Sequence, residues 1–180
     1  MRKIKTISCI NKKRAIGKEN KLLYSLSNDM QNFKSLTMGN VVLMGQNTFE
    51  SLPGKKPLSG RYNFILTDDE DYNVDINDNV FIVNSIPDAL ILSETLFPDL
   101  DLFVIGGASV YAQFMEQDLV DEQYLTIVSD EKEGDAYYPD GYDDDDKWRT
   151  LYRSYSQRDK GSGLSYIFTV LKREYGPERD

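Results

Sequence analysis

The sequence predicts a single-domain α/β fold: a mostly parallel central sheet of about eight strands, an antiparallel C-terminal strand and about four flanking helices. Short apolar runs typical of strands alternate with runs of helical periodicity along most of the chain. Near the C-terminus, two alternating runs, 150–156 and 165–172, flank a turn segment at 159–163, which is typical of a hairpin. We therefore expect parallel strands joined by helices, with antiparallel pairing at one edge of the sheet.

The first predicted strand, 5–10, is followed by a polar loop that carries residues 16–20 and by a helix over 28–37. The later strands are expected at 41–44, 62–66, 80–83, 102–105 and 123–128, and the later helices at 48–52, 87–96 and 109–117. The acidic, Asn-rich segment 68–79 is expected to be a surface loop. The domain should span residues 1–173, and residues 174–180 should form a polar tail.

Composition narrows the possible functions. A chain of 180 residues with 40% hydrophobic residues, 12 Tyr and 8 Phe has enough apolar surface for one packed core. The net charge of −9 argues against nucleic acid or an anionic membrane as a partner. The basic N-terminus leads into no signal-peptide apolar segment, and the single cysteine, Cys9, has no partner for an internal disulfide. We expect a cytoplasmic protein.

The chain contains no histidine. This excludes Ser-His and Cys-His nucleophiles and the commonest zinc ligand, and one cysteine is too few for a thiolate metal site. We expect no metal, so acid–base chemistry falls to Asp, Glu, Tyr, Lys or water.

Asp29 is the most informative residue, because it shares a helix face with apolar side chains. The residues at the spacing of a buried stripe are Leu26, Met30, Phe33 and Leu36. A carboxylate there neutralises, finds hydrogen-bond donors or binds a ligand, since burying an unpaired charge is costly. The alternative is a first-turn acid favoured by the helix dipole, with Ser27 or Asn28 as the N-cap.

Two predicted strands end in glycine and lead directly into a helix, at Gly45 and at Gly106–Gly107. Glycine permits close approach of the backbone to a ligand, and a helix N-terminus offers free N–H groups to phosphate. Two such ends on neighbouring strands are suited to a dinucleotide pyrophosphate. The alternative is tight turn packing, and neither segment matches the Rossmann fingerprint.

Six motifs occur in one order along the chain. They are Ile16-Gly17 with Asn20; Asp29 with Phe33-Lys34; Met44-Gly45 with Thr48-Phe49-Glu50-Ser51; Arg61 with Asn63; Val104-Ile105-Gly106-Gly107 with Tyr111; and Glu133-Gly134-Asp135 with Pro139. In this order and register, from Ile4 to Arg173, the sequence resembles the dihydrofolate reductase family.

The resemblance implies hydride transfer from NADPH to 7,8-dihydrofolate, giving tetrahydrofolate for one-carbon metabolism, in a monomer that antifolates inhibit. It assigns catalysis to Asp29, Leu22, Tyr24 and Thr126, with Asp29 supporting protonation of N5, Thr126 bracing Asp29 and Tyr24 ordering a nearby water. Arg61 matches the residue that binds the glutamate α-carboxylate; by itself it reads as an exposed strand-edge cation. The implied substrate-binding residues are Ile7, Cys9, Asp29, Met30, Phe33, Leu52, Leu58, Arg61, Ile105, Tyr111 and Thr126.

For the cofactor, the resemblance assigns phosphate contacts to the two glycine-led helix starts and closure over the nicotinamide to the loop 15–24, tethered by Asp135. The implied cofactor-binding residues are Cys9, Ile16, Gly17, Asn20, Leu22, Gly45, Gln46, Asn47, Thr48, Leu66, Thr67, Asp68, Gly106, Gly107, Ala108, Ser109, Val110, Tyr111 and Gln113.

The sequence departs from the family where the 2′-phosphate of NADPH is usually bound. Gln46 replaces a basic residue, and the acidic run 68–71 follows Thr67. Like charge near a phosphate is unfavourable, which predicts a weaker preference for NADPH and possible use of NADH. The alternative is that the acidic run turns outward, and that Thr67 with Lys55 or Lys56 binds the phosphate.

Two further functions stay open: a reductase of the same fold acting on another pterin-like or pyrimidine substrate, and a silent module that kept the fold. Asp29, Thr126 and Arg61 together argue against the first, and turnover of dihydrofolate distinguishes the second. The acidic run 143–146 is interpreted as a solvated surface loop.

Overall fold

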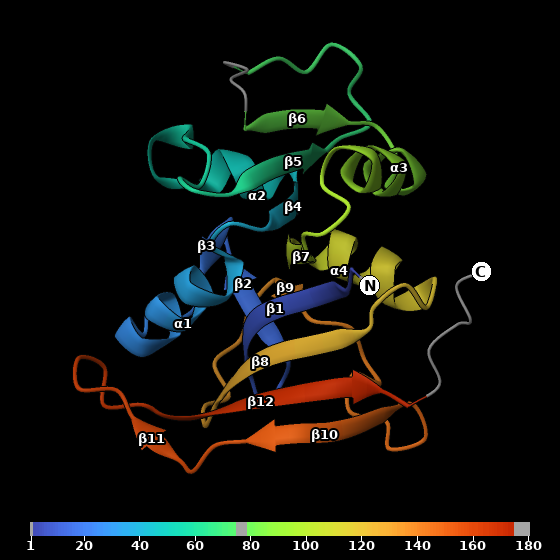
Figure 1. Ribbon diagram of the computed structural model, residues 1–180. Helices are drawn as coiled ribbons and strands as arrows, with labels where there is room; N and C mark the ends of the chain where they lie inside the picture. Colours follow the sequence, from blue (N-terminus) through green and yellow to red (C-terminus); the bar gives the residue numbers. More distant parts are fainter. Residues whose placement is uncertain (1, 75–78, 175–180) are drawn as a thin grey trace.

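A computed structural model describes residues 2–74 and 79–174 (Figure 1). The main sheet has the strand order β10-β12-β8-β1-β7-β4-β5-β6, and the short β11 pairs with β12. Its strands are β1 (Ile4–Asn11), β4 (Val41–Gly45), β5 (Tyr62–Leu66), β6 (Val80–Val83), β7 (Leu102–Gly106), β8 (Glu122–Val128), β10 (Trp148–Arg153), β11 (Gln157–Arg158) and β12 (Ser165–Arg173). The helices are α1 (Ser27–Thr37), α2 (Gln46–Ser51), α3 (Ile86–Leu96) and α4 (Ala108–Glu116), with a 3-10 turn η1 (Pro53–Lys55).

The predicted fold class is confirmed. The strands from β8 to β6 are parallel to their neighbours, and β12 runs antiparallel to both β8 and β10. The sheet twists from β6 at the top of Figure 1 to β10 at the bottom. The hairpin turn forms where expected: the Asp159 carboxylate accepts hydrogen bonds from Ser162 N (2.7 Å) and Oγ (2.8 Å), and Gly163 has a positive φ. Within the described residues, no helix has the length and apolarity of a membrane span.

Alternate residues of each central strand face opposite sides of the sheet and form two apolar layers. Val41, Leu43, Phe64 and Val104 belong to the core that also contains α3 and α4 residues. Val42, Met44, Ile65 and Phe103 belong to a second core, which includes Phe33 and Leu36 of α1 and Phe49 of α2. Helices α1 and α2 therefore cover one face of the sheet, and α3 and α4 cover the other.

The stretch 16–20, expected as a loop, is partly strand. β2 (Ala15–Lys18) pairs with β3 (Lys21–Leu22) and with β9 (Ala136–Tyr137) in a small separate sheet. Glu19 and Asn20 make the tight turn with positive φ values. The partner strand β9 is more than 100 residues away, so a pattern local to 16–20 carries no sign of this pairing.

Two expectations about α1 are wrong. Leu26 is buried and Phe33 and Leu36 are partly buried, but Met30 is 48% exposed and does not complete the stripe. The N-cap position is Leu26, which makes no side-chain cap bond. Asn28 instead donates to the Tyr166 hydroxyl (2.9 Å), because tertiary contact with β12 takes up its side chain.

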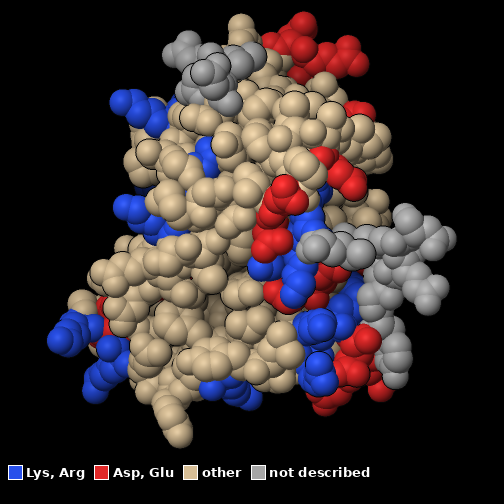
Figure 2. All heavy atoms as spheres, in the orientation of Figure 1, with Lys and Arg blue, Asp and Glu red and all other residues tan. Residues whose placement is uncertain are grey.

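The amino ends of β1 and β8 carry a network of charged side chains around the buried Glu122. Figure 2 shows basic and acidic side chains mixed on the surface in the region where Figure 1 marks the N-terminus. Glu122 is 4% exposed and pairs with Lys3, and Lys5 lies 2.6 Å from Asp101 and 3.7 Å from Glu122. Burial raises the pKa of Glu122, but hydrogen bonds from Lys3 and Tyr124 and the charge of Lys5 outweigh it, so the pKa is lowered.

Glu122→Gln is therefore expected to destabilise the fold. Because the pKa of Glu122 is lowered on folding, its charged form stabilises the fold at every pH above its ordinary pKa near 4.5. This stabilisation is lost as the pH falls through the lower pKa of the folded protein. Since Lys3 is partly exposed, we expect a moderate fall in Tm at pH 7, of about 4–8 °C, that narrows below pH 4. Thermal unfolding from pH 3 to 8 measures it. The control is Glu131→Gln, which removes an exposed pair with Lys12; an equal loss there would contradict the assignment.

Candidate active site

Asp29 lies in the first turn of α1 and faces β8, where the Thr126 hydroxyl donates a hydrogen bond to Asp29 Oδ1. Thr126 is 3% exposed, and its register partner on β1 is Cys9. Burial raises the pKa of Asp29, and the Thr126 hydrogen bond lowers it by less. The carboxylate is therefore held in a partly desolvated site with one fixed donor, and its own helix supplies no partner.

The apolar side chains predicted around Asp29 come together from four elements. Ile7 is buried in the second core, and the partly buried side chains packed there include Phe33, Leu52, Leu58 and Ile105. Met30, in contrast, is largely solvent-exposed. Two predicted substrate contacts belong to other clusters: Cys9 packs with Tyr24 and Leu26, and Tyr111 lies in the first core while its hydroxyl donates to Ile7 O (2.6 Å).

Arg61 is buried rather than an exposed strand-edge cation: it is 7% exposed, and its Nε has no hydrogen-bond partner. Burial lowers the pKa of Arg61. The turn that carries it is ordered by Asn63, whose side chain accepts from Leu58 N (2.8 Å) and donates to Leu58 O and Arg61 O (both 3.0 Å). A desolvated guanidinium with a free donor is suited to an anionic ligand.

The two glycine-led helix starts lie side by side, because β4 and β7 are neighbours in the sheet. A Cβ on Gly45 would lie 3.1 Å from Val110 Cγ2, and one on Gly107 would lie 3.3 Å from Thr48 Oγ1. These glycines therefore allow the start of each helix to lie close to the other helix. This close packing is what the alternative interpretation, tight turn packing, expects. Neither helix has a side-chain N-cap. In α4, Val110 N and Tyr111 N already donate to Gly107 O (both 3.0 Å), so the N–H groups left for a ligand are those at the very start of each helix.

The predicted cofactor residues of these segments occupy the helix starts and the end of β5. Gly45, Gln46 and Thr48 are partly exposed and Asn47 is exposed; Gly106, Val110 and Tyr111 are buried, Gly107 and Ala108 are partly exposed, and Ser109 and Gln113 are exposed and hydrogen-bonded to each other. The Gly106–Gly107 peptide is cis. Leu66 is partly exposed at the end of β5, next to the buried Thr67.

The acidic run begins beside Gln46. Thr67 Oγ1 donates to Gln46 Oε1 (2.5 Å), and the same hydroxyl accepts from Asp69 N (3.1 Å). Asp68 and Asp69 are exposed. Gln46 and the acidic run therefore belong to one hydrogen-bonded turn at the start of α2.

The loop between β1 and α1 is tethered by the segment after β8. Asp135 Oδ2 accepts from Glu19 N (2.8 Å), and Asp135 N donates to Gly17 O (3.0 Å). Ile16 packs on the first core, whereas Asn20 is exposed and Leu22 is 71% exposed. The tip of the loop is thus fixed by β9 and Asp135.

Tyr24 does not point its hydroxyl at Asp29. Asn11 Nδ2 donates to that hydroxyl (2.9 Å), which in turn donates to Asp130 Oδ2 (2.7 Å). The geometry therefore does not support the water-ordering role that the resemblance suggests for Tyr24.

The folded chain thus contains a carboxylate held by Thr126, a buried arginine and two neighbouring glycine-led helix starts. The profile of the family described as "Dihydrofolate reductase" matches residues 3–173. The chain belongs to the dihydrofolate reductase family.

Similar proteins agree with this membership. The dihydrofolate reductase of Lactococcus lactis is 37% identical over 159 residues, covering 88% of this chain and 89% of that protein. The dihydrofolate reductase of Buchnera aphidicola is 31% identical over 170 residues, covering 94% and 99%. A solved dihydrofolate reductase from Enterococcus faecalis, complexed with NADP(H) and RAB-propyl, has a TM-score of 0.81 and 24% identity over 96% of this chain and 97% of that chain, which shows the shared fold.

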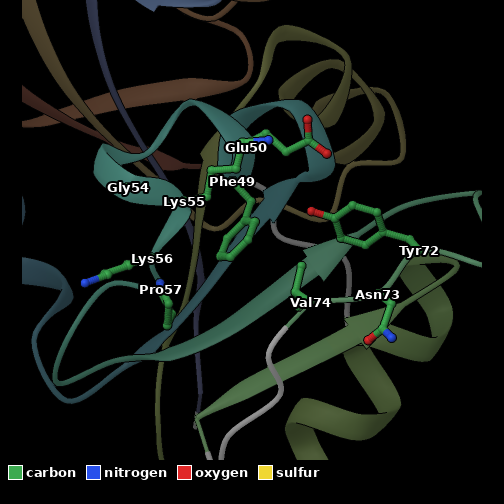
Figure 3. A pocket seen from close by; sticks show the side chains of 9 residues that line it. All are labelled: Phe49, Glu50, Gly54, Lys55, Lys56, Pro57, Tyr72, Asn73 and Val74. Atoms are coloured by element: carbon green, nitrogen blue, oxygen red, sulfur yellow. The ribbon is translucent and has the colours of Figure 1, made fainter.

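A cavity of about 660 Å³ lies between α2, η1 and the segment after β5 (Figure 3). It is lined by Phe49, Glu50, Gly54, Lys55, Lys56, Pro57, Tyr72, Asn73 and Val74. Of these, Lys55 and Lys56 are the lysines named above as alternative ligands of the 2′-phosphate. Figure 3 shows the rings of Phe49 and Tyr72 on either side of Val74.

Sequence reasoning gave no role to Asn11, and gave Asn63 a place in a motif without a function. Both are buried amides, with 1% and 0% exposure. The available signal was a polar residue beside apolar strand residues, at the end of β1 and near the start of β5, since a buried amide must find partners.

Asp29→Asn is expected to raise the stability of the free dihydrofolate reductase. Because the pKa of Asp29 is raised, its ionised form opposes folding at neutral pH; this penalty disappears as pH falls toward the ordinary value near 3.8. Asn accepts the Thr126 hydrogen bond without the charge. We expect a Tm about 2–4 °C above wild type at pH 7.5 and equal Tm values near pH 4, measured by calorimetry. A lower Tm at pH 7.5 would contradict this account.

Proposed function

We propose that Asp29 is the carboxylate with which this dihydrofolate reductase binds the pteridine and assists its protonation, during NADPH-dependent reduction of 7,8-dihydrofolate to 5,6,7,8-tetrahydrofolate. The observation that carries this proposal is the partly desolvated Asp29 braced by Thr126. The 2-amino group and N3 of a pteridine offer two parallel N–H donors, and one carboxylate accepts both.

The environment of Asp29 suits a proton-handling group. Burial holds its pKa above the ordinary value, so the charged and neutral forms lie closer in free energy at neutral pH than for an exposed carboxylate. Thr126 fixes the rotamer of the carboxylate, so that the bound ring has one orientation. In that orientation Asp29 supports the arrival of a proton at N5.

Arg61 and the apolar side chains bind the rest of the substrate. The unpartnered Nε of Arg61 supplies a donor for the α-carboxylate of the glutamate moiety. Ile7, Phe33, Leu52 and Leu58 contact the aromatic parts from β1, α1 and the segment after α2. Met30 is exposed in the free protein and gains contacts when substrate covers it.

The residues at the ends of β4 and β7 fit NADPH. Both helix starts lack side-chain caps, and glycine brings them together, so backbone N–H groups are available to the pyrophosphate. When bound, NADPH supplies the hydride. The loop that carries Ile16, Asn20 and Leu22 excludes water from the site, and Asp135 holds its tip.

We also infer a cytoplasmic location and a monomeric state, with tetrahydrofolate entering one-carbon metabolism and antifolates as inhibitors. The single cysteine supports a reducing compartment.

Asp29→Asn should abolish most turnover while cofactor binding persists. The variant keeps the shape of the side chain but accepts one N–H instead of two and cannot assist protonation, so we expect kcat at pH 7 to fall by about 10²–10³. Absorbance at 340 nm with dihydrofolate and NADPH gives the rate, and calorimetry gives cofactor affinity. Ser35→Ala, an exposed change on the same helix, serves as the control. Unchanged turnover would rule out the role of Asp29.

The acidic turn beside Gln46 should weaken selection of the 2′-phosphate. We expect wild-type kcat/KM to favour NADPH over NADH by well under three orders of magnitude, and Gln46→Arg to raise that ratio about tenfold by a charge-assisted hydrogen bond. Gln117→Arg adds the same charge at the far end of α4 and should leave the ratio unchanged. A wild-type ratio above about 10³ would show that the acidic run turns away from the phosphate.

A further inference from the structure

We propose that Asn11, Tyr24 and Asp130 form a hydrogen-bonded anchor that holds both ends of the loop 12–23 and thereby positions it for hydride transfer. The inference rests on the proposed function, because that function gives the loop its task of excluding water. The anchor gives Tyr24 a positioning role, and it adds Asn11 and Asp130, which are not among the predicted site residues.

Asn11 is the centre of the anchor. It is the last residue of β1 and is 1% exposed. Its Oδ1 accepts from Lys13 N and from Ala15 N (both 3.0 Å), and its Nδ2 donates to Tyr24 OH (2.9 Å) and to Lys132 O (2.8 Å). These four bonds use the full hydrogen-bonding capacity of the amide. One side chain thus joins the start of the loop, the end of the loop and the segment after β8.

Tyr24 connects the far end of the loop to this centre. Its ring packs with Leu26, Val128 and Tyr166, and its hydroxyl accepts from Asn11 and donates to Asp130 Oδ2 (2.7 Å). Burial and the hydrogen bond to Asp130 raise the pKa of Tyr24 to about 12, so the hydroxyl stays a donor in the working range of pH. Because α1 begins three residues later, the same anchor fixes the approach to Asp29.

The anchor is separate from the tether at Asp135. Asp135 binds the tip of the loop through Glu19 N and Gly17 O, whereas Asn11 and Tyr24 hold its two ends. If the ends are released, the tip contacts must order a longer stretch of chain by themselves, and the loop closes correctly less often. The loss therefore appears in loop opening and in the hydride step more than in global stability.

The central test is Tyr24→Phe, which keeps the buried ring and removes only the hydroxyl. Trypsin reports loop opening directly, because the loop contains Lys12, Lys13, Arg14, Lys18 and Lys21. We expect cleavage within the loop to accelerate about tenfold under native conditions and the single-turnover hydride rate to fall about tenfold, with KM for dihydrofolate little changed. Tyr155→Phe is the matched control, since that tyrosine is 94% exposed.

A second pair of variants separates anchoring from general destabilisation. Asp130→Asn keeps an acceptor for the Tyr24 hydroxyl and should resemble wild type. Asp130→Ala loses the bond from Tyr24 but keeps the bond from Asn11 to Tyr24, so it should show part of the Tyr24→Phe effect. The double variant Tyr24→Phe/Asp130→Ala should be no worse than Tyr24→Phe, because Tyr24→Phe already removes both bonds of the hydroxyl.

Two results would overturn the anchor: unchanged loop cleavage and hydride rate in Tyr24→Phe and Asp130→Ala, or cleavage that rises only with global unfolding. Wild-type protein that oxidises no NADPH would instead contradict the proposed function. The proteolysis comparison would still decide whether the three residues hold the loop.

Discussion

The burial of one carboxylate against the sheet is the constraint from which the active site follows. Asp29 is partly buried at the first turn of α1, and among the described residues Thr126 on β8 is its one recorded donor. An ionised group in that position opposes folding, since its pKa is raised by desolvation. The fold tolerates this cost because α1 is also held by Leu26, Phe33 and Leu36. The site is therefore a place where stability is reduced in favour of binding a ligand that offers two N–H groups.

The other parts of the site show the same division between packing and function. Gly45 lies close to Val110 of α4 and Gly107 lies close to Thr48 of α2, so a side chain at either glycine would crowd its neighbour, and the same approach places two uncapped helix starts together. Arg61 is buried with an unpaired Nε, while Asn63 satisfies the backbone of the turn around it. At this turn a neutral amide completes the local hydrogen bonds, and the Arg61 guanidinium keeps a free donor for a ligand.

The loop over the site depends on contacts from a distant segment. Residues 130–137 supply Asp130, Lys132 O, Asp135 and β9, which together hold the start, the tip and the end of the loop. This arrangement couples the position of the loop to the end of β8, the strand that also carries Thr126. The carboxylate and the loop that covers it are thus positioned by one continuous stretch of chain.

The pairing of the Asp29 carboxylate with the Thr126 hydroxyl was implied only by the family resemblance. The sequence by itself determined the α/β class, the main strands and helices and the hairpin turn at 159–163. These follow from local periodicity, from turn chemistry and from motifs whose order reflects the whole chain. Only the tertiary structure decided that residues 15–18 and 21–22 are strands, that Met30 is exposed, that Asn28 is not a cap and that Tyr24 points to Asp130. Apart from the short pairing of β2 with β3, each of these depends on the packing of a whole face or on a distant partner: β9 for β2, Asp130 for Tyr24 (106 positions) and Tyr166 for Asn28 (138 positions). Such contacts leave no periodic pattern among neighbouring residues.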